Sequence, residues 1–126
     1  MQNQFYTVVN CMDGRVQLPV IRYLRKKFDV EYVDSITEAG PNRILAEGAD
    51  PRTVEAILAR VQISVERHRS AGIAIAGHAD CAGNPAPEAT QIRHIRAAVE
   101  FMQGHYPRLP VTGLWVDENW QVHETD

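Results

Sequence analysis

The two cysteines of this chain each lie in a short segment that carries other reactive side chains. Residues 11–15 read Cys-Met-Asp-Gly-Arg, and residues 78–81 read His-Ala-Asp-Cys. Two thiolates and an imidazole form a ligand set that zinc prefers, so these segments predict a Zn²⁺ site. The candidate metal ligands are Cys11, His78 and Cys81. Asp13 and Arg15 follow the first ligand and could form a bidentate ion pair beside the metal.

Each of these segments follows an apolar run that has the composition of a buried strand. Residues 4–10 and 73–77 show no helical period, and each run ends just before a candidate ligand. Further strands are expected over residues 30–37 and 111–116. A polar turn after the last of these predicts that residues 120–124 return as an antiparallel edge strand.

Segments with helical spacing of apolar residues separate the strands. The pattern predicts a helix over residues 19–28 and a second one that begins at Pro51, with Asp50 as its N-cap. Gly72 is expected to stop the second helix, and a third helix is expected over residues 87–104.

The alternation of strands and helices predicts an α/β fold. We expect a central, mainly parallel sheet of about four strands flanked by helices, with an antiparallel edge strand at the C-terminus. Ligands bind such sheets at the carboxyl ends of the strands, where Cys11 and His78 are both placed. If their two strands are neighbours, the three candidate ligands meet.

Composition limits the other classes of function. A chain of 126 residues that is 44% hydrophobic and 23% charged fits one zinc domain over residues 1–126, with loops at 40–50 and 83–88. A net charge of -3 gives no basic footprint for nucleic acid, and we interpret the basic residues within 22–27 as a solvated helix face. No apolar stretch is long enough for a membrane span, and no signal peptide begins the chain. We therefore expect a cytoplasmic protein with reduced thiols, which favours a metal site.

The two motifs together resemble the signature of the β-class carbonic anhydrases, Cys-x-Asp-x-Arg after the first strand and His-x-x-Cys after the third. Residues 63–81 resemble that family's helix, glycine turn, strand and metal loop in one run. The pair Ala39-Gly40 and the closing pattern at 111–117 are also similar. The sequence is therefore identified as a short, divergent member of this family, with the order and spacing of the motifs as the specific signal.

The resemblance implies a carbonate dehydratase, a lyase that hydrates carbon dioxide reversibly to bicarbonate by zinc-bound hydroxide. It implies that Asp13 and Arg15 act as a catalytic dyad, in which Arg15 draws Asp13 off the metal and Asp13 orients the nucleophile. The backbone N–H of Ala82 is expected to donate to a substrate oxygen. A homodimer is expected from the family alone.

Several departures from the family pattern keep alternatives open. Gly14 stands where serine is common, Ala82 where glycine is usual, and Thr37-Glu38 where Arg-Asn is frequent. The same scaffold could hydrolyse carbon disulfide or carbonyl sulfide, or could be a non-catalytic zinc module in which Asp13 closes the metal shell. A thiol redox protein that uses both cysteines is less favoured, because the chain has no Cys-x-x-Cys motif.

Two further residues near the motifs are given no part in the chemistry. Asp80 lies between two ligands in a tight turn, so we expect it to point away from the metal and to serve loop solubility. Trp120 is expected to pack on the sheet together with Trp115.

Overall fold

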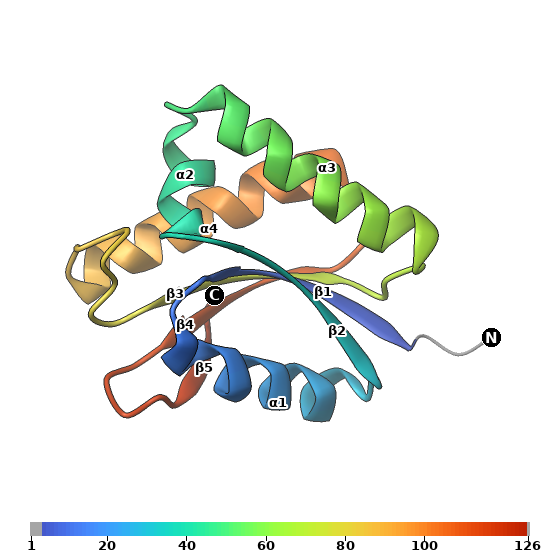
Figure 1. The fold of residues 1–126 in the computed structure, drawn as a ribbon, viewed down its shortest axis with the longest axis horizontal. Coiled ribbons are helices and arrows are strands. Elements are labelled where there is room, and N and C mark those ends of the chain that lie inside the picture. The colour runs from blue at the N-terminus through green and yellow to red at the C-terminus, as the bar shows by residue number, and fades with distance from the viewer. Residues whose placement is uncertain (1–3, 126) are drawn as a thin grey trace.

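Five strands form one mainly parallel sheet in the computed structural model, which describes residues 4–125 (Figure 1). The strands are β1 (Phe5–Cys11), β2 (Tyr32–Glu38), β3 (Ile73–His78), β4 (Val111–Val116) and β5 (Val122–Thr125). Their order across the sheet is β2-β1-β3-β4-β5. Every pairing is parallel except that of β4 with β5, which is antiparallel. The predicted fold class, including the antiparallel C-terminal edge, is confirmed.

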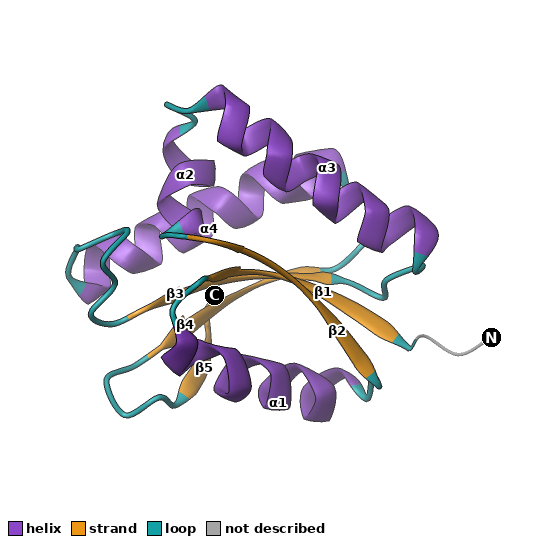
Figure 2. Ribbon diagram, in the orientation of Figure 1, coloured by secondary structure: helices purple, strands orange, loops and turns teal. Residues whose placement is uncertain are grey.

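Helices cover both faces of the sheet (Figures 1 and 2). They are α1 (Gln17–Phe28), α2 (Pro41–Glu47), α3 (Pro51–Arg67) and α4 (Glu88–His105), and a short 3₁₀ helix, η1 (Gly14–Val16), precedes α1. Helix α1 lies alone on one face, whereas α2, α3 and α4 lie on the other. None of the helices in residues 4–125 has the length and apolar character that crossing a membrane requires.

The hydrophobic core is divided by the sheet into two layers. The cluster on the α1 side includes Tyr6, Val8, Val20, Leu24, Ala74 and Leu114. The cluster on the opposite side includes Val9, Ile36, Ile57, Val61, Ile75 and Met102. Because β1 and β3 are buried on both faces, their sequences are nearly continuous apolar runs rather than alternating ones.

Helix α3 begins as predicted but ends earlier than the sequence suggests. The side chain of Asp50 accepts a hydrogen bond from the Thr53 N–H, at 3.3 Å, and Pro51 occupies the first turn. The helix ends at Arg67, and Arg69 has a left-handed backbone, with φ 54°. Gly72 is therefore not the cap. It lies against the Tyr6 ring, whose Oη would be 2.5 Å from a Cβ at this position.

Helix α2 lies within residues 40–50, which were predicted to be a loop. It has seven residues, too few for a periodic apolar pattern to indicate a helix. Gly40 precedes it with a left-handed backbone, φ 62°, and Pro41 fills the first helical position. The buried side chains of Asn42 and Leu45 turn it toward the sheet and α4.

Candidate metal centre

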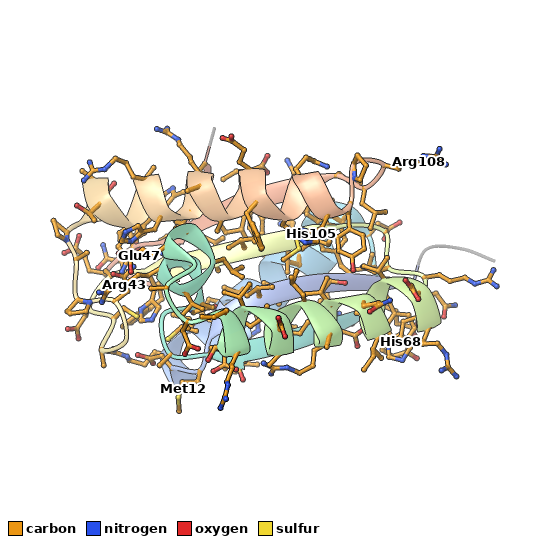
Figure 3. The ribbon with its side chains drawn as sticks, turned by 90° about the horizontal axis from the view of Figure 1, so that it is seen from above. Met12, Arg43, Glu47, His68, His105 and Arg108 are labelled. Atoms are coloured by element: carbon orange, nitrogen blue, oxygen red, sulfur yellow. The ribbon has the colours of Figure 1, made fainter. Side chains whose placement is uncertain are left out.

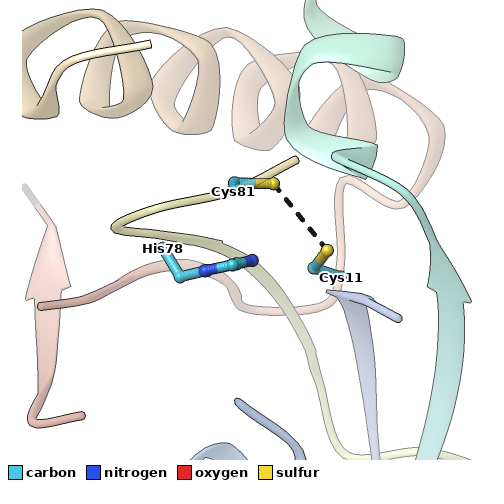
Figure 4. Close-up of side chains that lie close together, drawn as sticks. All are labelled: Cys11, His78 and Cys81. Carbon is cyan, nitrogen blue, oxygen red and sulfur yellow. Dashed lines mark hydrogen bonds between the residues drawn. The ribbon is translucent and has the colours of Figure 1, made fainter. Parts of the chain in front are cut away.

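Adjacent strands β1 and β3 bring the candidate ligands to one edge of the sheet. Cys11 is the last residue of β1, His78 is the last residue of β3, and the two strands pair in parallel. Cys81 lies in the loop that follows β3. The Sγ atoms and the imidazole nitrogen of these three buried residues all lie within 4.8 Å of one another (Figure 4). The structure therefore places the three side chains around a common point.

The imidazole of His78 leaves one nitrogen free to face the sulfur atoms. Its Nδ1 lies 2.7 Å from the carbonyl oxygen of Ala79, which fixes the ring when Nδ1 carries the proton. Its Nε2 is buried and has no hydrogen-bond partner among the described residues. Figure 4 shows the ring directed toward Cys11 and Cys81. An orphaned buried nitrogen costs free energy, and a metal ion would satisfy it.

The two sulfur atoms have the spacing that tetrahedral zinc requires. Cys11 Sγ and Cys81 Sγ are 3.8 Å apart. Two Zn–S bonds of about 2.3 Å at a tetrahedral angle separate the sulfur atoms by about 3.8 Å. The residues present therefore fit a zinc ion with three protein ligands.

The groups around the sulfur atoms favour a negative charge on Cys11. The Cys81 thiol, and then His78, lower the pKa of Cys11, and the backbone N–H groups of Gly40 and Asp13 act in the same direction. The same contact raises the pKa of Cys81, because a second thiolate beside the first is unfavourable without a cation. One thiolate next to one thiol is a site that a divalent cation would complete by releasing the second proton.

The loop that carries Cys81 is packed closely against the start of α2. A Cβ at Gly83 would overlap the backbone of Ala39, and one at Gly40 would lie 2.7 Å from the carbonyl carbon of Gly83. The two glycines therefore allow one backbone segment to approach another. This contact keeps the Cys81 loop beside the end of β2, which pairs with the end of β1.

A buried amide network connects the same loop to two helices. The side chain of Asn42 in α2 donates to Gln91 Oε1 in α4 at 2.7 Å, and Gln91 Nε2 donates to the Asn84 carbonyl at 2.7 Å. All three residues are at most 2% exposed. The sequence analysis missed this network, and its local signal was weak because lone amides usually lie at the surface.

Asp13 and Arg15 form a bidentate ion pair next to the ligand cluster. Arg15 Nε donates to Asp13 Oδ1 at 3.0 Å, and Arg15 Nη2 donates to Asp13 Oδ2 at 2.7 Å. The Arg15 side chain lowers the pKa of Asp13 to about 2, and the Arg15 backbone N–H contributes further. Within the described residues, the group of close ligand atoms contains no oxygen of Asp13. The carboxylate is thus held by Arg15 rather than by the thiolate and imidazole set.

Asp80 does not join the ligand cluster, as expected, but it contacts Arg15, which the sequence analysis did not foresee. Its Oδ2 accepts a hydrogen bond from Arg15 Nη1 at 3.2 Å, and its carbonyl oxygen accepts one from Arg15 Nη2 at 3.1 Å. The ring of Trp120 lies 4.8 Å from the Arg15 guanidinium carbon. Trp115 is a buried residue of β4, and Trp120 is partly buried against the core cluster on the α1 side, so the predicted packing of both is confirmed.

The remaining candidate, Ala82, lies at the exposed surface directly after Cys81. Met12, which follows Cys11, is 64% exposed, and Figure 3 shows it projecting from the surface of the molecule. His68 lies near the start of β1, the end opposite to Cys11, where its ring stacks on Phe5 and its Nδ1 is 2.6 Å from Asp34 Oδ2. His68 therefore lies too far from the cluster to take part in its chemistry.

Comparison with known proteins agrees with this geometry. The family model described as "Putative carbonic anhydrase" matches residues 1–126. No curated protein sequence matches the chain. Among solved structures, a carbonic anhydrase from Glaciozyma antarctica is similar with a TM-score of 0.65 and 14% identity, over 97% of this chain and 81% of that one. The β-carbonic anhydrase CcaA is similar with a TM-score of 0.66 and 18% identity, over 100% of this chain and 75% of that one.

A third similar structure reports two tetrameric β-carbonic anhydrases from Sordaria macrospora, with a TM-score of 0.58 and 14% identity, over 98% of this chain and 81% of that one. At identities this low, the structural similarity shows a shared fold and nothing more. The family itself is shown by the match over the full sequence. The chain belongs to this carbonic anhydrase family and is a carbonic anhydrase-like lyase.

Proposed function

We propose that this protein hydrates carbon dioxide reversibly to bicarbonate, with Zn²⁺ bound by Cys11, His78 and Cys81. The observation that carries the proposal is the cluster of three ligand atoms within 4.8 Å, in which His78 Nε2 is buried and has no hydrogen-bond partner in residues 4–125. Three protein ligands leave one tetrahedral position open, which is the arrangement of catalytic rather than structural zinc sites. The family match supplies the substrate class.

The chemistry that zinc supplies is the acidification of water, which provides hydroxide near neutral pH. The chain's own residues orient the reaction. The carboxylate of Asp13, fixed by Arg15, accepts a hydrogen bond from the attacking nucleophile and directs its lone pair toward the carbon atom. The N–H of Ala82 donates to the substrate oxygen on which negative charge develops.

The alternatives are not favoured. A non-catalytic module needs Asp13 as the fourth ligand, but both of its carboxylate oxygens accept hydrogen bonds from Arg15 in this structure. Hydrolysis of carbon disulfide or carbonyl sulfide would use the same cluster, and no contact of the described residues points to a sulfur-containing substrate.

A homodimer in the cytoplasm is part of the proposal. Met12 and Leu18, which follow Cys11 in the sequence, are 64% and 58% exposed, and a partner copy that covered them would remove apolar surface from water. The similar Sordaria macrospora proteins are tetrameric. Light scattering coupled to size-exclusion chromatography measures the mass, and a purely monomeric protein at assay concentration would contradict the dimer.

The experiment that tests the activity combines metal analysis with stopped-flow hydration of carbon dioxide. We expect about one zinc per chain and rapid hydration. Asp13→Asn should keep the zinc but lower turnover by about a hundredfold. Asp29→Asn is the matched control, because Asp29 caps the far end of α1 and its left-handed backbone suits asparagine. Zinc without hydration would overturn the proposal, and full turnover by Asp13→Asn would overturn the role of Asp13.

A further inference from the structure

We propose that Asp80 and Trp120 are positioning residues that hold the Arg15 guanidinium where it keeps the Asp13 carboxylate away from the metal ligands. The inference rests on the proposed zinc site and adds to it the means by which one coordination position stays open. It assigns a part in the chemistry to two residues for which the sequence analysis expected only loop solubility and packing on the sheet.

The guanidinium of Arg15 contacts three residues, Asp13, Asp80 and Trp120. Its Nε and Nη2 donate to Asp13, its Nη1 donates to the Asp80 carboxylate at 3.2 Å, and Nη2 also reaches the Asp80 carbonyl at 3.1 Å. The guanidinium carbon lies over the Trp120 ring, 4.8 Å from the ring centroid. All three nitrogens are used, and the contacts come from the start of η1, the metal loop and the turn between β4 and β5.

Arg15 needs these partners because it lies at the surface. Its side chain is 46% exposed and that of Asp13 is 20% exposed, so an ion pair between these two alone leaves the long Arg15 side chain some freedom. The Asp80 carboxylate is 84% exposed and contributes weakly by itself, but together with the Asp80 carbonyl it adds two hydrogen bonds that reduce the side-chain entropy of Arg15. The Trp120 ring adds a cation–π contact with the guanidinium, and tryptophan is the strongest aromatic partner for a cation.

Asp13 would otherwise compete for the metal. A carboxylate oxygen is a zinc ligand, and Asp13 lies only two residues after Cys11. The open and closed arrangements therefore differ in whether Asp13 binds Arg15 or the cation. Any contact that stabilises Arg15 in its present place shifts this equilibrium toward the open arrangement.

The backbone has an unusual conformation at both positioning residues. Asp80 and Trp120 have left-handed backbones, with φ of 56° and 62°, which is unusual for residues other than glycine. At Asp80 this conformation goes with a side chain and a carbonyl that both contact Arg15. The Trp120 turn is held by Asp117, whose carbonyl accepts from the Trp120 N–H at 2.9 Å and whose Oδ1 accepts from the Gln121 N–H at 3.0 Å.

The test uses Co²⁺ as a spectroscopic probe of the coordination shell. Visible and X-ray absorption distinguish a shell that contains water from one that contains the Asp13 carboxylate. We expect Asp80→Ala and Trp120→Leu each to lower the ratio of open to closed protein by about fivefold. Trp120→Phe, which retains a ring face, should restore most of the wild-type spectrum.

The matched control is Glu118→Ala, which removes an exposed carboxylate from the same turn as Trp120. Its spectrum should equal that of the wild type, which excludes a general effect of charge. In metal-free protein, the Arg15 Nε–H should exchange slowly with solvent, and its exchange should quicken in Asp80→Ala. Circular dichroism identifies any variant that fails to fold. If Trp120→Leu fails to fold, the exchange of the Arg15 Nε–H in Trp120→Phe supplies the comparison.

The outcomes separate this inference from the proposed function. Unchanged cobalt spectra and unchanged Arg15 exchange in folded Asp80→Ala and Trp120→Leu would overturn the positioning role even if the wild type hydrates carbon dioxide. The expected spectral shifts in a protein without hydration would support the positioning role and overturn the proposed activity. Failure of the wild type to bind Co²⁺ would overturn both.

Discussion

Cys11 Sγ and Cys81 Sγ lie 3.8 Å apart, although the two residues are separated by 70 positions in the chain. Pairing of β1 with β3 brings them together, because the carboxyl ends of parallel neighbours lie at one edge of the sheet. The free energy of metal binding at such a site is also free energy of folding.

Zinc should therefore stabilise the protein. Free zinc at about 1,000 times the dissociation constant would add about 4 kcal/mol to the free energy of unfolding. Thermal unfolding with and without a chelator measures this effect. Cys81→Ser should lose both the zinc and its stabilisation, whereas His105→Ala, which changes an exposed histidine outside the cluster, should keep both. Equal zinc content in Cys81→Ser and wild type would contradict the assigned ligand.

The close approach of Gly83 to Ala39 predicts a specific effect of a single methyl group. Gly83→Ala would place a Cβ on the Ala39 backbone, so the Cys81 loop must move. We expect a loss of about 1–3 kcal/mol in the free energy of unfolding and weaker zinc binding. Denaturant unfolding and metal titration measure the two effects.

Gly104→Ala provides the control for this change. Apart from its chain neighbours and the backbone of its own helix, no atom of residues 4–125 lies within 4 Å of a Cβ at Gly104, which is an exposed position of α4. This variant should be more stable by about 0.5–1 kcal/mol, because alanine loses less backbone entropy in a helix. Equal stability of the two variants would show that the metal loop tolerates displacement.

The buried amides of α2 and α4 give a third prediction. Gln91→Leu removes the partner of Asn42 Nδ2 and of the Asn84 carbonyl, and each unpaired buried group costs about 1–3 kcal/mol. Chemical denaturation should show this loss. Gln62→Leu on the exposed face of α3 makes the same chemical change and should alter stability little. A stable Gln91→Leu protein would mean that the network is dispensable.

The pH dependence of stability should reveal Tyr6. Burial raises the pKa of Tyr6 to about 12, whereas an unfolded tyrosine has a pKa of about 10. The folded state thus favours the neutral phenol, so the stabilisation is complete below about pH 10 and is lost as the pH rises toward about 12. The difference corresponds to about 2–3 kcal/mol.

Denaturant unfolding of wild type and Tyr6→Phe measures this contribution at about pH 8 and about pH 11. Phenylalanine keeps the ring that stacks on Phe28, with centroids 4.2 Å apart, but has no ionisable group. The variant should lose less stability than the wild type between the two pH values. Parallel losses in both proteins would exclude Tyr6 as the titrating group.

Most elements could be predicted from local patterns. The buried runs at 73–77 and 111–116 fall within β3 and β4, and the proline after Asp50 marks the start of α3. Helix α2 could not be predicted, because seven residues between two glycines carry no periodic signal. The end of α3 was misplaced for a related reason: a glycine that stops a helix and one that accommodates the Tyr6 ring look alike in sequence.

The sequence by itself determined the ligand types and the strand ends that carry them, because residue chemistry and β-run composition are local properties. Tertiary structure decided which side chains surround Arg15. Asp80 and Trp120 lie 65 and 105 positions beyond it, and only the packing of the metal loop and the β4–β5 turn against η1 brings them into contact. Such contacts depend on the distances between folded segments, and no local pattern of residues encodes them.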